Sequence, residues 1–203
     1  MPKITKITQQ KRSSRVNVYL GERFAFGISK KTLVDFDLFV GKEISQKEIN
    51  EILEKDQKIK ALEKSFRLLG IRPRSKKELE KKLKEKGFAE KIIKNTLKRL
   101  KELGYLDDRK FTQAWLEARK LSSKGKFVIQ RELKEKGVNE EIIKKTLEDY
   151  KSEEEFERAL KLAEKKRRAY KKLPFFEKKI KISRFLANRG FSWEIISRIL
   201  KRI

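Results

Sequence analysis

One pattern occurs three times in this sequence, and it restricts the possible folds more than any other feature. Around Gly87, Gly137 and Gly190, leucine stands four residues before the glycine, and an apolar residue follows it directly. Two isoleucines stand five and six residues after each glycine, and leucine stands ten residues after it. The glycines are 50 and 53 residues apart. Agreement at so many fixed offsets predicts three homologous structural units in tandem.

Each unit is predicted to contain three helices. The glycine ends one helix, because it tolerates the left-handed conformation of a helix C-terminus, and the isoleucine pair lies on the next helix. Another amphipathic helix precedes them, with apolar residues three or four positions apart: Leu62, Phe66 and Leu69; Phe111, Trp115 and Ala118; Phe156, Leu160 and Ala163. One unit has little core of its own, so neighbours should stack. We therefore predict a mainly α fold with three tandem three-helix repeats in an elongated or curved array, with core positions for Phe66, Trp115, Phe156 and Phe185.

The amino-terminal region has the pattern of a small antiparallel β-meander. Residues 15–20 and 23–28 alternate with period two, and Gly21-Glu22 between them suits a type II′ hairpin turn. Ser29 is placed to cap a short helix, and Ser45 with Glu48 predicts a capping box at the start of another. We place the domain boundaries at 1–54 for the meander with its short helices, and at 55–106, 107–150 and 151–203 for the three repeats.

The chain contains neither cysteine nor histidine. This composition excludes disulfides, cysteine-ligated zinc and histidine-based acid–base catalysis. Asp107-Asp108 precedes a predicted helix, so N-capping explains the pair better than a metal site does. We expect no cofactor and no enzyme activity, and an enzyme using carboxylates and Mg²⁺ is the remaining catalytic alternative. With neither an apolar run near the ~20 residues of a bilayer span nor an apolar signal segment, we expect a cytoplasmic protein.

The charge is strongly positive, with 56 Lys and Arg against 30 Asp and Glu, or +26 net, which favours a polyanionic partner. Between residues 161 and 184, eleven Lys or Arg accompany two Glu, and aromatic residues interrupt the run, a composition suited to phosphate contacts with base stacking. Lys124 and Lys126 flank Gly125 at a predicted helix start, where backbone N–H groups could bind phosphate. The candidate contact residues are Arg72, Arg74, Lys124, Lys126, Arg131, Lys165, Lys166, Arg167, Arg168, Tyr170 and Lys172.

These candidates have a second interpretation. Any single lysine on a helix more commonly belongs to a solvated face than to a binding site. Tyr170, Phe175 and Phe176 fit either core packing or contact with a partner. A net charge of +26 nevertheless exceeds what solubility requires, so the set as a whole favours binding.

The repeats resemble the RecX regulatory protein family. The resemblance covers about residues 58–203, and the amino-terminal region is similar to the β-containing extension of some members. It rests on the ordered series of three units and on these residues: Arg72-Pro73-Arg74-Ser75 with Glu78-Leu79; Gly104-Tyr105-Leu106-Asp107-Asp108 with Phe111, Trp115, Arg119, Lys124-Gly125, Ile129, Glu132-Leu133 and Lys136-Gly137-Val138; and Arg184-Phe185-Leu186-Ala187 with Arg189-Gly190-Phe191 and Ile195-Ile196.

This resemblance implies a function. RecX-like proteins bind the RecA recombinase in the groove of its filament on single-stranded DNA. They suppress RecA's ATP hydrolysis, strand exchange and coprotease activity, and so act on DNA repair, homologous recombination and the SOS response. They do so without chemistry of their own, so no catalytic residue transfers to this chain. We expect a monomer that binds the RecA filament and single-stranded DNA, directly or within the filament, and no membrane.

A stand-alone DNA-binding protein is the alternative. Three-helix units are similar to helix-turn-helix domains, in which the amino end of a helix enters the major groove. This alternative predicts tight DNA binding without RecA and a steep dependence on salt concentration. The dispersal of positive charge over several loops disfavours it, because no single recognition helix stands out.

Overall fold

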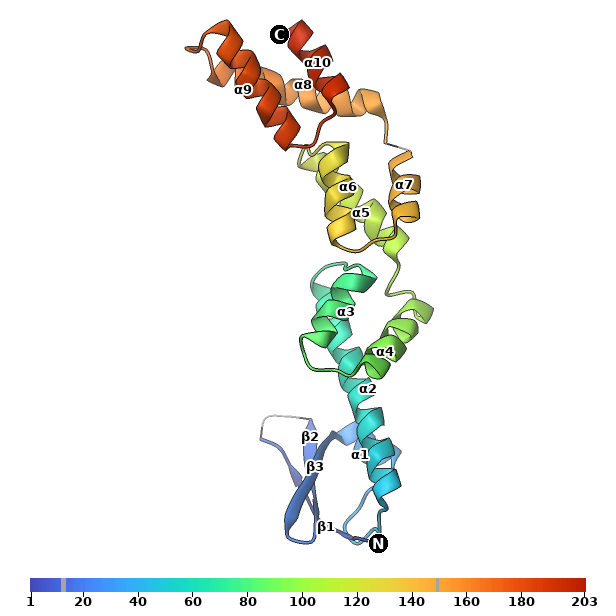
Figure 1. Ribbon diagram of the computed structural model, residues 1–203. Helices are drawn as coiled ribbons and strands as arrows, with labels where there is room; N and C mark the ends of the chain where they lie inside the picture. Colours follow the sequence, from blue (N-terminus) through green and yellow to red (C-terminus); the bar gives the residue numbers. More distant parts are fainter. Residues whose placement is uncertain (12–13, 149) are drawn as a thin grey trace. The chain divides into compact units, whose positions relative to one another are not determined.

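The computed structural model describes residues 1–11, 14–148 and 150–203 (Figure 1). The chain divides into two compact parts, residues 1–72 with 80–103 and residues 73–79 with 104–203, and each is described by itself. In chain order the elements are β1 (Ile4–Gln9), β2 (Arg15–Leu20), β3 (Arg23–Ser29), α1 (Lys30–Asp35), α2 (Gln46–Ile71), α3 (Lys76–Lys84), α4 (Glu90–Glu102), α5 (Asp108–Leu121), α6 (Lys126–Glu135), α7 (Glu140–Glu148), α8 (Ser152–Ala169), α9 (Phe175–Asn188) and α10 (Trp193–Arg202).

The β-meander predicted at the amino terminus is confirmed. The strands pair antiparallel in the order β1-β2-β3, and Leu20 pairs with Arg23 across the two-residue turn. Gly21 has φ +63°, a conformation that glycine adopts without the strain of a Cβ atom. One face of the sheet is buried by α1 and α2, with a core that contains Val18 and Ile28 from the strands and Ile52 from α2.

The side chain of Asp56 fastens α2 to the sheet. Its carboxylate accepts hydrogen bonds from the Ser29 backbone N–H (2.7 Å), Thr32 Oγ1 (3.2 Å) and Arg15 Nη2 (3.1 Å), and Lys60 Nζ lies 3.0 Å away. Burial by itself would raise the pKa of Asp56. The hydrogen bonds from Ser29, Lys60 and Arg15 outweigh burial and hold the pKa below its usual value.

We expect Asp56→Asn to destabilise the first part by about 1–2 kcal/mol at pH 7, because hydrogen bonds to a charged acceptor become neutral ones. The native pKa of Asp56 is depressed, so its contribution is complete above the unfolded value of about 4 and disappears as pH falls through the native pKa. Hydrogen exchange of the β2 and β3 amides at pH 7 and pH 3 measures this. If the free energy of opening differs between the wild type and Asp56→Asn by the same amount at both pH values, the predicted pH dependence is wrong.

Helix α2 extends further than the sequence pattern indicates. Its predicted capping box is confirmed: Ser45 Oγ accepts from the Glu48 N–H (3.2 Å), and the Ser45 N–H donates to Glu48 Oε2 (2.8 Å). From there one helix continues to Ile71, across the boundary that we placed between residues 54 and 55. The same helix therefore serves both the β region and the first repeat. The core position predicted for Phe66 is wrong, because its side chain is 36% exposed and Ser65 is the buried residue at that level.

The three-helix organisation is confirmed, with α2–α4, α5–α7 and α8–α10 as the repeats. The glycines have φ of +79°, +70° and +86° and follow α3, α6 and α9. In every repeat the residue after the glycine donates its N–H to the leucine carbonyl five residues earlier, at 3.1–3.3 Å. The glycine N–H bonds three residues back at 2.9 Å. These two bonds define the Schellman motif, and they explain the residue types at these offsets.

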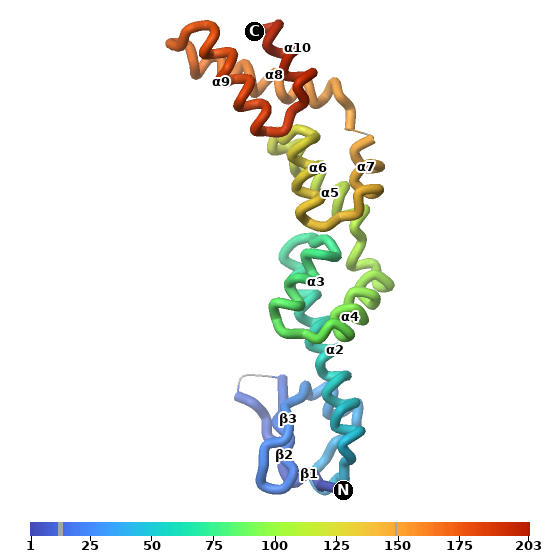
Figure 2. Tube along the Cα trace, in the orientation of Figure 1, coloured from blue at the N-terminus to red at the C-terminus, as the bar shows by residue number. Residues whose placement is uncertain are grey.

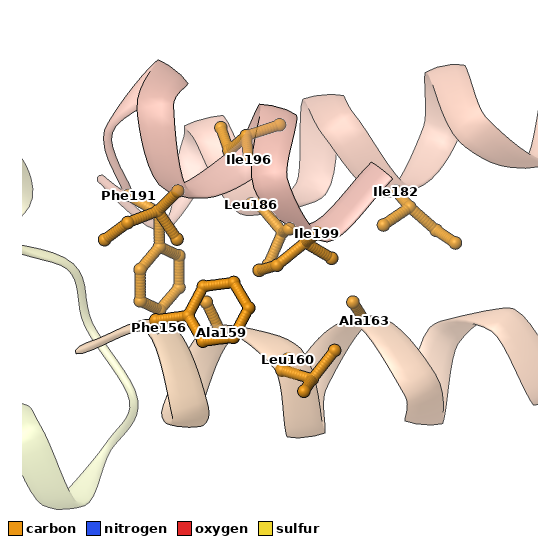
Figure 3. Packing of buried hydrophobic residues seen from close by; sticks show 10 residues of the cluster. Phe156, Ala159, Leu160, Ala163, Ile182, Leu186, Phe191, Ile196 and Ile199 are labelled. Atoms are coloured by element: carbon orange, nitrogen blue, oxygen red, sulfur yellow. The ribbon is translucent and has the colours of Figure 1, made fainter. Parts of the chain in front are cut away.

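The second part of the chain contains two cores, one for each of its repeats. The α5–α7 core includes Phe111, Leu133, Ile143 and Tyr150. Trp115 packs against it, partly buried, but Ala118 is exposed and Leu116 is buried in its place. The α8–α10 core, shown in Figure 3, is built from the apolar faces of all three helices and from Phe191 in the turn between α9 and α10: Phe156, Ala159, Leu160, Ala163, Ile182, Leu186, Phe191, Ile195, Ile196 and Ile199. The core position of Phe156 is confirmed, and Phe185 packs at its margin.

Candidate functional site

The basic run between residues 161 and 184 lies on α8, α9 and the turn between them (Figure 2). Lys165, Arg167 and Arg168 are exposed at the carboxyl end of α8, and Lys172 is exposed beyond it. The first turn of α8 is acidic, with Glu153, Glu154 and Glu155. The acidic amino end and the basic carboxyl end of this helix therefore both interact favourably with the helix dipole. Lys166 is partly buried, and its Nζ lies 4.8 Å from the ring centroid of Phe185. The exposed cations are therefore the ones available to a partner.

The aromatic residues of this region divide into two kinds. Tyr170 packs at the margin of the α8–α10 core, and Lys166 Nζ lies 5.7 Å from its ring centroid. Phe175 and Phe176, in the first turn of α9, are 60% and 79% exposed. Their ring centroids are 6.4 Å apart with the planes at 86°, and Lys179 Nζ lies 4.5 Å from the Phe175 centroid. Two exposed aromatic faces beside cations suit contact better than packing.

The remaining basic candidates lie in loops and on α6. Arg72 is the C-cap of α2 and is exposed, whereas Arg74 is half-buried. Arg131 is exposed on α6, with its Nε 3.9 Å from Glu135 Oε1. Lys124 is half-buried and Lys126 is exposed.

The amino end of α6 is covered by the turn between α9 and α10. The Gly125 N–H donates to the Arg189 carbonyl (2.8 Å), and the Phe127 N–H donates to the Gly190 carbonyl (3.1 Å). The Lys126 N–H donates to Glu155 Oε1 (2.7 Å). These backbone donors are therefore occupied, and the prediction that they bind phosphate is wrong. The Lys124 and Lys126 side chains remain as candidates for contact with a partner.

The amino end of α3 is covered in the same way, by the turn between α6 and α7. Ser75 Oγ donates to the Lys136 carbonyl (2.6 Å), and the Lys76 N–H donates to Asp108 Oδ1 (2.8 Å). Lys136 Nζ also pairs with Glu78 Oε1 at 2.9 Å. The neighbouring Asp107 caps α5 as predicted, accepting from the Arg109 N–H at 2.8 Å. We call the two covered helix ends the glycine joints. In the first joint, residues 135–138 contact the start of α3, and in the second joint, residues 188–191 contact the start of α6.

Close packing makes glycine necessary in both joints. A Cβ atom on Gly137 would overlap the Lys77 side chain, and one on Gly190 would overlap the Val128 backbone nitrogen. A Cβ atom on Gly125 would overlap the Gly190 carbonyl. The sequence pattern predicts that Gly137 and Gly190 end helices, but it does not predict the joints, because nothing in the local pattern indicates which distant segment each turn contacts.

A polar cluster beside the first joint accounts for several residues of the RecX resemblance. Glu132 accepts hydrogen bonds from Trp115 Nε1 (2.9 Å) and Arg119 Nε (2.6 Å). The Arg119 guanidinium and Lys136 Nζ lie 4.2 Å and 4.1 Å from the Trp115 ring centroid. Two cations therefore contact the indole ring, and each contact is worth roughly 1 kcal/mol when partly desolvated. This cluster is structural.

Two buried groups complete the second joint. The Tyr150 hydroxyl donates to the Lys124 carbonyl (3.2 Å) and accepts from Arg158 Nη2 (2.7 Å). Burial raises the pKa of Tyr150 to about 12, so the hydroxyl keeps its proton at neutral pH. Burial also raises the pKa of Glu155, and the hydrogen bond from the Lys126 N–H offsets only part of that rise.

We expect Glu155→Gln to retain or slightly increase stability at pH 7, whereas Glu155→Ala should cost about 1–3 kcal/mol by leaving the Lys126 N–H unsatisfied. Because the native pKa of Glu155 is raised, the contribution of this residue to stability falls as pH rises from its unfolded pKa through its native pKa, so the relative advantage of glutamine should grow from pH 4 to pH 7. Urea unfolding followed by tryptophan fluorescence at both pH values measures this. Equal damage from glutamine and alanine would show that the charge itself is required.

Within the described ranges, no three acidic side chains gather into a group that could hold a metal ion. No helix among these residues is long and apolar enough to cross a membrane.

Four family models match the chain. The Regulatory protein RecX N-terminal domain matches residues 2–45, and the first, second and third RecX three-helix domains match residues 61–100, 107–147 and 153–200. Regulatory protein RecX of Bacillus licheniformis is 42% identical over 203 residues, covering 99% of this chain and 77% of that protein. Regulatory protein RecX of Bacillus subtilis (strain 168) is 36% identical over 205 residues, covering 100% and 78%.

Solved structures show the same fold. A crystal structure of regulatory protein RecX matches with a TM-score of 0.74 at 31% identity, and both chains are covered completely. RecX from Lactobacillus salivarius matches with a TM-score of 0.67 at 28% identity, covering 73% of this chain and 99% of that one. Matches of both sequence and fold extend over the β region and all three repeats, so this chain belongs to the RecX family of regulatory proteins.

Proposed function

We propose that this protein binds RecA filaments on single-stranded DNA and inhibits the ATPase, strand-exchange and coprotease activities of RecA by occupancy, without a catalytic step of its own. The observation that supports this most strongly is membership of the RecX family over the whole chain, whose members are named regulatory proteins. Acting on RecA, the protein would work in the cytoplasm and restrain homologous recombination, DNA repair and the SOS response.

The charge distribution supports a polyanionic partner. The exposed cations at the end of α8 and the exposed Phe175–Phe176 pair offer both phosphate contacts and faces for base stacking. We propose the same role for the side chains of Arg72, Arg74, Lys124, Lys126 and Arg131. Each glycine joint covers the amino end of a repeat's middle helix, which disfavours major-groove recognition by α3 or α6.

Steady-state ATP hydrolysis by RecA on single-stranded DNA tests the proposal. The protein, added at less than one molecule per RecA protomer, should lower the rate in proportion to its concentration and should slow strand exchange in parallel. An unchanged hydrolysis rate over a wide range of concentrations would refute the proposal. A heat-unfolded sample of the same protein is the control for non-specific competition by its positive charge.

Binding to DNA alone distinguishes the remaining alternative. Affinities for single-stranded and duplex oligonucleotides at two salt concentrations should be modest and should rise strongly when RecA is present. Tight, steeply salt-dependent duplex binding without RecA would instead indicate a stand-alone DNA-binding protein.

A further inference from the structure

The glycine turn of the first repeat lacks the contact that the other two turns make. In the joints, the carbonyls of Lys136 and Arg189 accept hydrogen bonds from Ser75 Oγ and the Gly125 N–H. Lys86 holds the equivalent position, directly before Gly87. Among the residues that the structure describes, no backbone N–H outside the regular helices and strands donates to the Lys86 carbonyl. A Cβ atom on Gly87 would have no neighbour within 4 Å, in contrast to Gly137 and Gly190.

The two joints show what such a turn binds. Each covers the amino end of a helix, α3 in one and α6 in the other, and the contact includes the N-cap residue. The first N–H groups of a helix lack partners within it and carry partial positive charge, so carbonyl oxygens at a helix C-terminus complement them. The uncovered Lys86 carbonyl and its turn therefore suit the amino end of another helix.

The surroundings of the turn specify the charge of that helix. A shallow pocket beside Gly87 is lined by Lys60, Glu63, Lys64, Arg67, Lys86 and Phe88, with four cations against one carboxylate. In the first joint, Lys136 Nζ pairs with Glu78, the third residue of the covered helix, at 2.9 Å. Lys86 corresponds to Lys136, so an acidic residue in the first turn of the bound helix would find a cation in the equivalent place.

The middle helices of a second copy of this chain fit this turn poorly, and in α8, whose first turn is acidic, Glu155 already accepts a hydrogen bond from the Lys126 N–H. The amino ends of α3 and α6 are already covered within the chain. In α9 the position equivalent to Ser75 and Gly125 is Lys178, whose N–H is bonded to the Pro174 carbonyl (3.0 Å) because α9 begins a turn earlier. The net charge of +26 also repels a second copy from a pocket that is itself basic.

We propose that the Gly87 turn and this pocket bind the amino end of a helix with an acidic first turn on a RecA protomer. This inference rests on the proposed function, because that function supplies the partner. It gives the first repeat a role in protein recognition separate from the polyanion contacts of the third.

Crosslinking with the full-length protein tests the inference. A benzoylphenylalanine in place of Glu63, which is exposed at the pocket, is irradiated with RecA on single-stranded DNA, and the adducts are mapped by mass spectrometry. Adducts should fall in the first turn of a RecA helix that contains Asp or Glu. Adducts with a second copy of this chain, with DNA, or with RecA residues outside such a turn would overturn the inference.

A matched pair of charge reversals provides the second measurement. Lys86→Glu should weaken binding to RecA filaments roughly tenfold, whereas Lys98→Glu on α4 makes the same charge change at another exposed position and should stay within about twofold. Circular dichroism confirms that both variants are folded. Equal affinities overturn the inference while wild-type inhibition of RecA ATPase still supports the proposed function, and loss of that inhibition in the wild type would refute the function itself.

Discussion

Gly190→Ala is expected to destabilise the second part of the protein by roughly 2–5 kcal/mol. Alanine at φ +86° carries about 1–2 kcal/mol of backbone strain. Its methyl group would also overlap the backbone nitrogen and side chain of Val128, and displacing backbone in a closely packed contact costs about 1–3 kcal/mol more. Both tryptophans, Trp115 and Trp193, lie in this part, so urea unfolding followed by fluorescence measures the decrease in stability.

Two further alanine variants separate backbone strain from disruption of the joint. Gly125 has φ −84°, which alanine tolerates, so Gly125→Ala tests only the overlap with the Gly190 carbonyl. Gly87→Ala has the strain of φ +79° with no neighbour to displace, and it lies in the first part. We expect Gly125→Ala to lower the midpoint reported by tryptophan and Gly87→Ala to leave it unchanged. A wild-type midpoint for Gly125→Ala would show that the second glycine joint does not form in solution.

Reversing three exposed charges at the end of α8 should weaken binding to RecA filaments on single-stranded DNA at least 100-fold. The variant Lys165→Glu, Arg167→Glu, Arg168→Glu removes three cations and adds three anions at one end of a helix. Cations that bind phosphates release counterions, so the slope of log affinity against log salt should also become shallower by about 0.7 for each phosphate of the single strand that the variant no longer neutralises. Fluorescence anisotropy with labelled DNA over a range of salt concentrations measures both quantities.

The control carries the same change in net charge elsewhere. Lys94→Glu, Lys98→Glu and Lys101→Glu alter three exposed positions on α4. If binding depends on the local arrangement at α8, this control should lose much less affinity and should retain its salt slope. An equal decrease in affinity for both variants would mean that total charge, and not the basic run, governs binding.

The local architecture of this protein could be predicted from its sequence. The Gly87, Gly137 and Gly190 turns each depend on hydrogen bonds that span three to five residues, so the residue types that form them recur at fixed offsets. The hairpin at Gly21 and the capping box at Ser45 are local in the same sense. Apolar spacing also placed Phe156 and the isoleucine pairs on buried faces, because helical periodicity fixes which residues share a face.

Partners that are distant along the chain required the tertiary structure. Ser75 and Lys136 are 61 residues apart, and no periodic pattern connects them. Long-range packing in the second part also occupies the backbone N–H groups around Gly125, which were predicted to bind phosphate. In the first part, packing buries the small residues Ala61 and Ser65 and leaves Phe66 exposed. The sequence thus determined where helices begin, end and turn, since these depend on bonds within a few residues. Contacts between segments that meet only in the folded chain decided which turns are covered, and they left the Gly87 turn without a close neighbour among the described residues.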